Sequence, residues 1–151
     1  MDFRFKQDHQ VCGIRASALI CHENCILAVK YKPGYYAPVG GAIQVGEDST
    51  DAIRREVMEE LGTDCTVKEL AFIVENQFIE ENAHWHTIEF HYLVELEKYQ
   101  TSYKVVETDG TYSCEWLPLD ALDSYDFRPS FLKEELSKWN GTVKHIISKG
   151  K

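Results

Sequence analysis

The chain has 151 residues, 44% of them hydrophobic, and a formal net charge of −9. This length predicts a single domain, residues 1–151, with its own core. The acidic balance argues against binding to duplex nucleic acid, which depends on Lys and Arg neutralising phosphates. No stretch has the roughly 18 apolar residues of a membrane helix, and residues 1–6 lack the apolar run of a signal peptide. The five cysteines have no framework spacing, so we expect reduced thiols and a cytoplasmic protein.

The first third of the chain predicts strands followed by a helix. Residues 3–6 suggest a short strand or arm, and the apolar segments 13–21 and 25–31 flank a turn at 22–24, which predicts a hairpin. Residues 35–39 lead into the pair Gly40-Gly41. A helix is then predicted over residues 49–61, with Ser49 or Asp48 as its N-cap and Gly62 as its C-terminal stop.

The rest of the chain predicts two long strands and several short elements. The long strands are 66–78 and 86–96, joined by a polar loop at 79–85, and apolar residues alternate along 86–96. The polar segment 98–110 predicts a long functional connection. We expect a strand at 112–117, a turn or short helix at 118–122, a helix within 129–139 and a last strand at 142–147. Mixed strands with two main helices predict an α/β or α+β sandwich.

The most informative stretch is 41–62, which reads GAIQVGEDSTDAIRREVMEELG. Gly41 is followed six residues later by Glu47, and then by Arg55-Glu56, Glu59-Glu60 and Gly62. This pattern resembles the Nudix box, G-x5-E-x7-R-E-U-x-E-E-x-G-U with U a bulky aliphatic residue, and departs from it only at the last position, where the chain has Thr63. The chain is therefore similar to Nudix hydrolases. The resemblance implies an α/β/α sandwich with a mixed sheet and a catalytic helix.

The spacing of the box places three carboxylates on one helix face. At about 100° per residue, Glu56, Glu59 and Glu60 fall within one sector, beside an apolar stripe of Ile53, Val57 and Leu61. Carboxylates this close repel one another unless a cation lies among them. Hard cations such as Mg²⁺ or Mn²⁺ prefer oxygen ligands and bridge phosphate oxygens. The sequence therefore predicts an Mg²⁺ site, with Mn²⁺ as the second candidate.

The other box residues support the same interpretation. Arg55 lies next to Glu56 and Glu59, so it can orient a carboxylate through a bidentate pair, and Glu47 can assist from the loop. The resemblance also implies that the Gly41 carbonyl is a metal ligand beside Glu56, Glu59 and Glu60. A solvated acidic helix face would explain the glutamates alone, but it does not explain the glycines, Glu47 and Arg55 at the family spacing.

The resemblance implies hydrolysis of the pyrophosphate bond in a nucleoside diphosphate linked to another group. The base that activates water is Glu56 in the box or Glu107 in the polar segment before Tyr112, and an exposed loop glutamate remains the alternative for Glu107. Further substrate contacts are expected from Arg15, Tyr35, Tyr36, Phe78 and Trp85, because flat aromatic rings suit nucleobases and an arginine suits phosphates. Core packing is an equal alternative for the tyrosines and Phe78. A position at a loop edge is the alternative for Trp85, and an exposed strand edge is the alternative for Arg15.

Two functions remain in competition at this point. The first is a metal-dependent pyrophosphohydrolase of small nucleotides or nucleotide sugars. The second is a non-catalytic nucleotide sensor on the same fold, because a fold does not fix a function. The complete set of Arg55, Glu56, Glu59 and Glu60 favours the enzyme. The expected partners are a small nucleotide-type substrate and, as a further option, a second copy of the chain in a homodimer, with no membrane.

Overall fold

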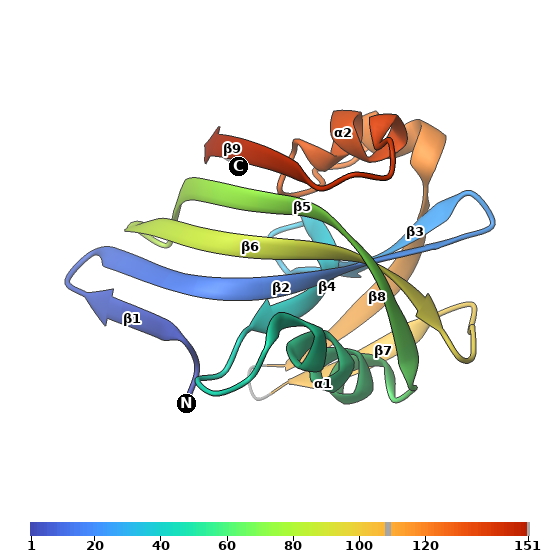
Figure 1. Ribbon diagram of the computed structural model, residues 1–151, viewed down its shortest axis with the longest axis horizontal. Helices are drawn as coiled ribbons and strands as arrows, with labels where there is room; N and C mark the ends of the chain where they lie inside the picture. The colour runs from blue at the N-terminus through green and yellow to red at the C-terminus, as the bar shows by residue number, and fades with distance from the viewer. Residues whose placement is uncertain (108–109, 151) are drawn as a thin grey trace.

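The computed structural model describes residues 1–107 and 110–150, except for the side chains of 105–107 and 110–111. The described residues form nine strands in a mixed sheet with the order β7-β8-β3-β4-β2-β6-β5-β9, and β1 pairs with β2. Figure 1 shows helix α1 on one side of this sheet and α2 on the other. The strands are β1 (Arg4–Gln7), β2 (Gln10–His22), β3 (Cys25–Lys30), β4 (Tyr36–Ala42), β5 (Cys65–Glu80), β6 (Ala83–Leu96), β7 (Tyr103–Glu107), β8 (Gly110–Pro118) and β9 (Lys144–Gly150). The helices are α1 (Ser49–Leu61), the 3₁₀ segment η1 (Leu119–Ser124) and α2 (Leu132–Lys138).

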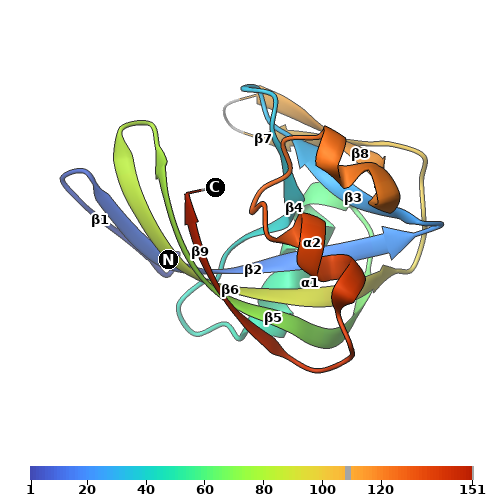
Figure 2. The ribbon, with the colours of Figure 1, turned by 90° about the horizontal axis from the view of Figure 1, so that it is seen from above.

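Long strands extend part of the sheet into an arm. β2 pairs with β6 in parallel, and β6 pairs with β5 in a hairpin closed by Glu81 and Asn82. Both turn residues have positive φ, 50° and 60°, as the tight turns of β-hairpins require. Figure 2 shows the β1–β2 and β5–β6 hairpins extending side by side away from the helices. The arm therefore forms a wall beyond the main body.

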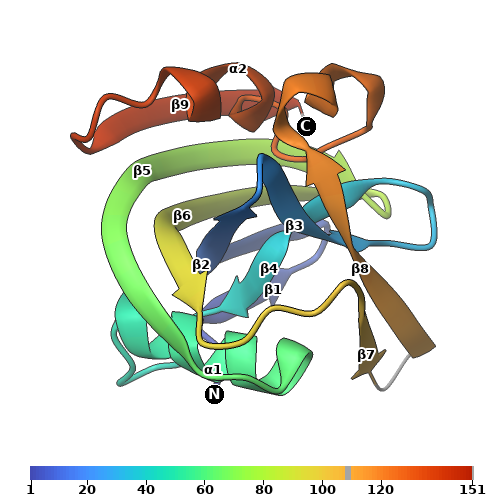
Figure 3. The same cartoon turned by 90° about the vertical axis from the view of Figure 1, so that its right-hand side faces the viewer.

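Each face of the sheet has its own core. On one face, Ile53, Val57 and Leu61 of α1 pack among residues of β2, β3 and β4. On the other face, Phe72 of β5 packs with Phe127, Leu132 and their neighbours from the C-terminal segment. Figure 3 shows β5 curving from the side of α2 to the side of α1. The predicted sandwich with a mixed sheet between helices is thus confirmed, including the apolar stripe of α1.

The structure corrects three predicted segments. Residues 36–42 form strand β4 rather than only a lead into the glycine pair, because β4 pairs with β2 and β3. The loop predicted at 79–85 is wrong, since β5 and β6 continue until only Glu81 and Asn82 remain between them. The segment 98–110 contains strand β7, which pairs with β8. Each of these segments contains polar residues or glycines, which do not suggest a strand on their own. They form strands because they pair with a neighbouring strand, and the local sequence does not reveal that pairing.

Other expectations concern the chain as a whole. The hairpin of β2 and β3 is confirmed by the pairing of Cys21 with Ile26 and of His22 with Cys25. All five cysteines are free thiols. Among the described residues, no helix combines the length and apolar character needed to cross a membrane.

Candidate active site

Helix α1 is fixed at both ends by residues of the box at 41–62. Asp48 is the N-cap, and its side chain accepts a hydrogen bond from the N–H of Asp51 at 2.9 Å. Gly62 ends the helix in the left-handed conformation, with φ 70°, as is usual at helix C-termini. Glu47, just before the helix, accepts a hydrogen bond from the N–H of Gln44 at 3.0 Å. These contacts set the acidic face of α1 against the turn that follows β4.

Arg55 joins α1 to that turn. Its Nε donates to Glu47 Oε2 at 2.8 Å, and its Nη2 donates to Glu47 Oε1 at 2.9 Å. Nη1 donates to Glu56 Oε1 at 2.8 Å and, over 3.4 Å, to Glu59 Oε2. Nη2 also reaches the carbonyl oxygen of Ala42 at 3.1 Å. Because a bidentate arginine pair fixes geometry as well as charge, Arg55 orients the carboxylates relative to β4.

The same contacts shift the pKa values of the site. The hydrogen bond from Arg55 lowers the pKa of Glu47, and the bond to Glu47 raises the pKa of Arg55. Burial raises the pKa of Glu56; the contact with Arg55 and the charge of Arg15 lower it, and the charge of Glu59 raises it. Arg55 therefore holds Glu47 firmly in its charged form. At Glu56 the effects on the pKa oppose one another, and burial, which raises it, is the largest.

Gly41 and Glu56 are in direct contact. A Cβ atom built on Gly41 would lie 2.5 Å from Glu56 Oε1, which is closer than any side chain allows. The side chain of Glu56 is only 13% exposed and accepts a hydrogen bond from Arg55 at 2.8 Å, so it could move aside only by giving up this contact. Only glycine lets the backbone approach this carboxylate so closely. The Gly41 backbone and the Glu56 carboxylate are therefore close neighbours.

The remaining predicted carboxylates differ in their surroundings. Glu59 has a side chain that is 58% exposed. Glu60 is half-buried, and its charge adds to burial in raising the pKa of the Cys114 thiol on β8. Glu107 is the last residue of β7, and its side chain lies outside the described residues. The structure therefore brings Glu47, Glu56 and Glu59 around one arginine, and the role of Glu107 stays a prediction.

A cavity of about 630 Å³ lies between the β5–β6 arm and the main body. Three of the five predicted substrate residues line it, namely Arg15, Tyr35 and Phe78. Tyr36 is 9% exposed and packs in the core. Trp85 is not among the described residues that line the cavity. It stacks on Phe78, with ring centroids 5.8 Å apart. Trp85 therefore supports the wall that Phe78 presents to the cavity.

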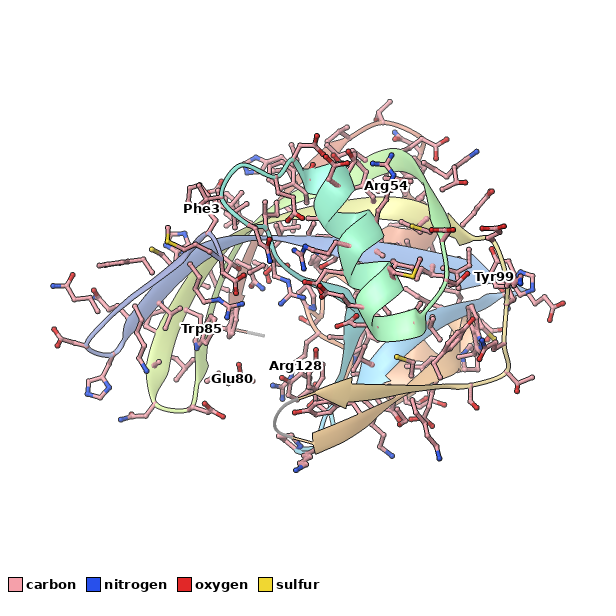
Figure 4. All side chains as sticks on the ribbon, turned by 90° about the horizontal axis from the view of Figure 1, so that it is seen from below. Phe3, Arg54, Glu80, Trp85, Tyr99 and Arg128 are labelled. Carbon is pink, nitrogen blue, oxygen red and sulfur yellow. The ribbon has the colours of Figure 1, made fainter. Side chains whose placement is uncertain are left out.

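Tyr35 connects the two sides of the cavity mouth. Its hydroxyl donates to Glu80 Oε1 at 3.0 Å, at the end of β5. The guanidinium of Arg128 lies 4.2 Å from the centre of the Tyr35 ring, a cation–π contact. Figure 4 shows Glu80 and Arg128 close together where the arm faces the body. Burial, with a further contribution from Glu80, raises the pKa of Tyr35, so its hydroxyl stays a donor.

The floor of the cavity is a buried polar cluster on β5 and β6. Asn76, Thr87, Glu89 and His91 are 4%, 6%, 3% and 0% exposed. Glu89 accepts hydrogen bonds from Asn76 Nδ2 at 3.0 Å, Thr87 Oγ1 at 2.7 Å and His91 Nε2 at 2.9 Å. Asn76 and Glu89 line the cavity. Although burial acts to raise the pKa of Glu89, the contacts from His91, the charge of Arg15 and the bond from Asn76 lower it to about 2.

The sequence alone does not reveal this floor. The apolar alternation of residues 86–96 assigns Ile88 and Phe90 to a core face, so Thr87, Glu89 and His91 read as the solvent side. In the structure both faces are covered, because the C-terminal elements close over the second one. The available signal was the polar residues at every second position, Thr87, Glu89 and His91, in the middle of a strand long enough to be central.

Arg15 lies between the floor and the box. Its position on β2 pairs with Glu89 on β6 and with Ala42 on β4. Its charge lowers the pKa of both Glu89 and Glu56, so its guanidinium acts on both sites. A ligand in the cavity therefore meets a fixed positive charge on the side that leads to α1.

Comparisons with known proteins agree with this geometry. The NUDIX domain model matches residues 13–139, and no curated protein matches the sequence at a significant level. Among solved structures, an ADP-ribose pyrophosphatase from Streptococcus suis is 18% identical, with a TM-score of 0.62 over 89% of this chain and 97% of that one. A MutT protein from Bacillus halodurans is 20% identical, with a TM-score of 0.62 over 91% and 90%. A UDP-X diphosphatase is 18% identical, with a TM-score of 0.63 over 88% and 66%.

The structural likenesses establish the fold, and the family model covers most of the chain, including the entire box at 41–62 and strands β3 to β8. Thr63, the one departure from the box, is 9% exposed, and its hydroxyl donates to the carbonyl oxygen of Asp64 at 3.2 Å. The chain belongs to the Nudix hydrolase family.

Proposed function

We propose that the protein hydrolyses the pyrophosphate bond of a small nucleotide or nucleotide sugar with a divalent cation as cofactor. The observation that carries this proposal is the contact of Arg55 with Glu47, Glu56 and Glu59. A protein that only bound nucleotides would not need three carboxylates held by one arginine next to a side-chain-free backbone at Gly41. The cavity beside β4, with Arg15 and Phe78 in its lining, offers room for the substrate.

The metal ligands in this proposal are the Gly41 carbonyl and the carboxylates of Glu56, Glu59 and Glu60, for Mg²⁺ or Mn²⁺. The donor set fits, because all four groups are oxygen ligands and the Gly41 backbone touches Glu56. Within the described residues, no three or more acidic, His or Cys side chains are gathered so that they could hold a metal ion as a site made of protein side chains alone. Mg²⁺ does not need one, since it usually keeps water and substrate oxygens among its ligands. When bound, the cation offsets the negative charge that develops on the phosphates.

The other residues act by position and charge. Arg55 orients Glu56 and Glu59, and Glu47 holds Arg55 in place. Arg15 offers its guanidinium to the phosphates, while Phe78 and Tyr35 offer aromatic faces to the rest of the substrate. The base that takes a proton from the attacking water is Glu56 or Glu107. We place the reaction in the cytoplasm, where the free thiols stay reduced.

The test is a panel of nucleotides and nucleotide sugars with Mg²⁺ or Mn²⁺, followed by release of phosphate or pyrophosphate. Glu60→Gln should lower turnover by orders of magnitude and weaken Mn²⁺ binding measured by calorimetry, with an unchanged circular dichroism spectrum. Glu134→Gln on α2, an exposed glutamate, is the matched control and should keep both properties. Tight nucleotide binding without turnover of any substrate would instead support the nucleotide-sensor alternative.

A further inference from the structure

Arg15 is a cation without a contact partner of its own. It is half-buried in the lining of the cavity, and among the described residues no hydrogen bond or ion pair involves its side chain. Arg55 and Arg128, by contrast, bind carboxylates at 2.8 and 2.9 Å. A guanidinium has five N–H donors, and a charge that is taken partly out of water needs an opposite charge nearby. Arg15 is therefore held by charges that it does not touch.

Two carboxylates supply this charge from opposite sides. Arg15 on β2 lies beside Glu89 on β6 in the strand register, and both residues line the cavity. On its other side, Arg15 lies beside Ala42 on β4, next to Gly41, whose backbone lies close to Glu56. Burial acts to raise the pKa of both carboxylates, and the charge of Arg15 acts to lower both. The guanidinium is therefore shared between the cavity floor and the box.

The two carboxylates differ in how firmly they are held. Glu89 is 3% exposed and accepts three hydrogen bonds from side chains of the floor, so its carboxylate is fixed where it lies. Glu56 accepts a hydrogen bond from Arg55 at Oε1, and in the part of the chain that the structure describes no hydrogen bond reaches its Oε2. This open oxygen can take either a metal ion or the guanidinium of Arg15.

We propose that Glu89 is a positioning residue whose fixed charge keeps the guanidinium of Arg15 on the cavity side of β4, away from Glu56. Glu56 Oε2 then stays open for the cation, and the N–H groups of Arg15 stay open for the phosphates. Without the charge of Glu89, Arg15 is attracted by Glu56 alone and occupies the oxygen that the cation needs. This inference rests on the proposed function, because it explains how the metal site and the phosphate contact of that function coexist.

A double-mutant cycle of Glu89→Gln and Arg15→Gln tests this role, with Mn²⁺ affinity measured by calorimetry in the absence of substrate. Glu89→Gln removes the charge and keeps the size of the side chain. It should weaken Mn²⁺ binding at least about tenfold, or about 1.4 kcal/mol, which lies within the range for residues of one charge network. In the Arg15→Gln background the same change should cost less than about threefold, since no guanidinium is left to move onto Glu56.

The two backgrounds also exclude a simpler effect. If Glu89 acted on the cation only through its own negative charge, its loss would weaken Mn²⁺ binding equally in both backgrounds. Equal losses therefore overturn the inference, and so does an unchanged affinity in the single variant. Glu75→Gln is the control, because its carboxylate bonds His145 outside the described cavity lining, and it should keep the wild-type affinity for Mn²⁺.

Thr87→Val gives a second test should Glu89→Gln not fold. The change removes the hydroxyl that donates to Glu89 Oε2 at 2.7 Å, so the carboxylate gains the freedom to close on Arg15. Arg15 then has fewer donors for phosphates, and inorganic pyrophosphate should bind about threefold more weakly in the presence of Mn²⁺, the range for one hydrogen bond. Mn²⁺ affinity itself should stay at the wild-type value. Unchanged pyrophosphate affinity would show that Glu89 does not control Arg15.

The outcomes separate this inference from the proposed function. Hydrolysis of a nucleotide by the wild-type protein, with no coupling between Glu89 and Arg15 in Mn²⁺ binding, overturns this inference alone. Coupling in Mn²⁺ binding without turnover of any nucleotide supports the inference and removes the proposed enzyme. Absence of Mn²⁺ binding in the wild-type protein removes the metal site of the proposed function and this inference with it.

Discussion

Arg55 holds Glu47 through two parallel hydrogen bonds, from Nε at 2.8 Å and from Nη2 at 2.9 Å. Both side chains are largely covered, with 23% and 15% exposure. Because Glu47 uses both oxygens on Arg55, the remaining nitrogen, Nη1, is directed at Glu56 and Glu59. The pair therefore determines where the two helix carboxylates lie relative to Gly41, and its loss should be felt in activity more than in folding.

Arg55→Lys should lower kcat by at least about tenfold, because an ammonium group cannot form the bidentate contact with Glu47 and hold Glu56 at the same time. The free energy of unfolding should fall by about 1–3 kcal/mol, the range for lost hydrogen bonds to charged groups. Steady-state kinetics and urea titration measure the two effects.

Arg54→Lys is the matched control on the neighbouring residue. Arg54 is 53% exposed and pairs only with Asp51 among the described ion pairs, and exposed pairs contribute about 0–1 kcal/mol. It should remain near wild type in both assays. Equal losses in the two variants would show that Arg55 has no special role.

Gly41→Ala should abolish binding of Mn²⁺ while the fold is retained. The new methyl group would meet the Glu56 carboxylate, at 2.5 Å from Oε1, and would push the side chain away from the backbone. Gly40→Ala provides the contrast, since its Cβ would lie 2.2 Å from the backbone oxygen of Ala16, which cannot move as a side chain does. Calorimetry and thermal unfolding should thus separate the two glycines, and full Mn²⁺ affinity in Gly41→Ala would contradict the proposed site.

The acidic helix was predictable because its information is local. Asp48, Gly62 and the spacing of Glu56, Glu59 and Glu60 follow from capping and from the helical repeat. The structure confirms the cap and the buried stripe of α1. Strand β4 was missed because Gly40 and Gly41 read as a turn, and only pairing with β2 reveals the strand.

The cavity floor was not predictable for a different reason. Whether Glu89 faces water or a closed cavity depends on elements that are distant in the sequence, because the C-terminal segment packs on that side, with Phe131 against His91. Likewise, Tyr35 and Tyr36 are adjacent in the chain, but one lines the cavity and the other lies in the core. Alternation along a strand separates the two faces, yet it does not say what covers each of them.

Glu107→Ala tests where the water-activating base lies. We expect the rate to remain within about threefold of wild type, which places the base in the box at Glu56, because loss of a general base typically costs at least a hundredfold. The rate should be measured at saturating substrate and metal, so that only the chemical step is compared. A loss of a hundredfold or more with unchanged metal affinity would assign the base to Glu107.

Tyr35→Phe should loosen the mouth of the cavity. The change removes only the hydroxyl that donates to Glu80 at 3.0 Å, while the ring stays in place against Arg128. Because the lost bond joins Tyr35 to Glu80 and the ring still lines the cavity, we expect KM to change by less than about fivefold, or about 1 kcal/mol, and Tyr35→Ala to raise it further. Faster hydrogen exchange at the β5–β6 turn in Tyr35→Phe would show that the bond restrains the arm, whereas identical exchange would exclude this role.

Glu89 makes stability depend on pH in a defined range. Its pKa falls from an ordinary value of 4.5 to about 2 in the folded protein, so the unfolded chain takes up the proton first as the pH falls. The stabilisation is present above pH 4.5 and is lost between about pH 4.5 and 2, with a size on the order of 3 kcal/mol at about 1.4 kcal/mol per pKa unit. Glu89→Gln should therefore be less sensitive to acid than wild type over this range, in urea titrations at a series of pH values. Glu75→Gln should follow the wild-type curve, and parallel curves for Glu89→Gln and wild type would show that Glu89 does not carry the depressed pKa.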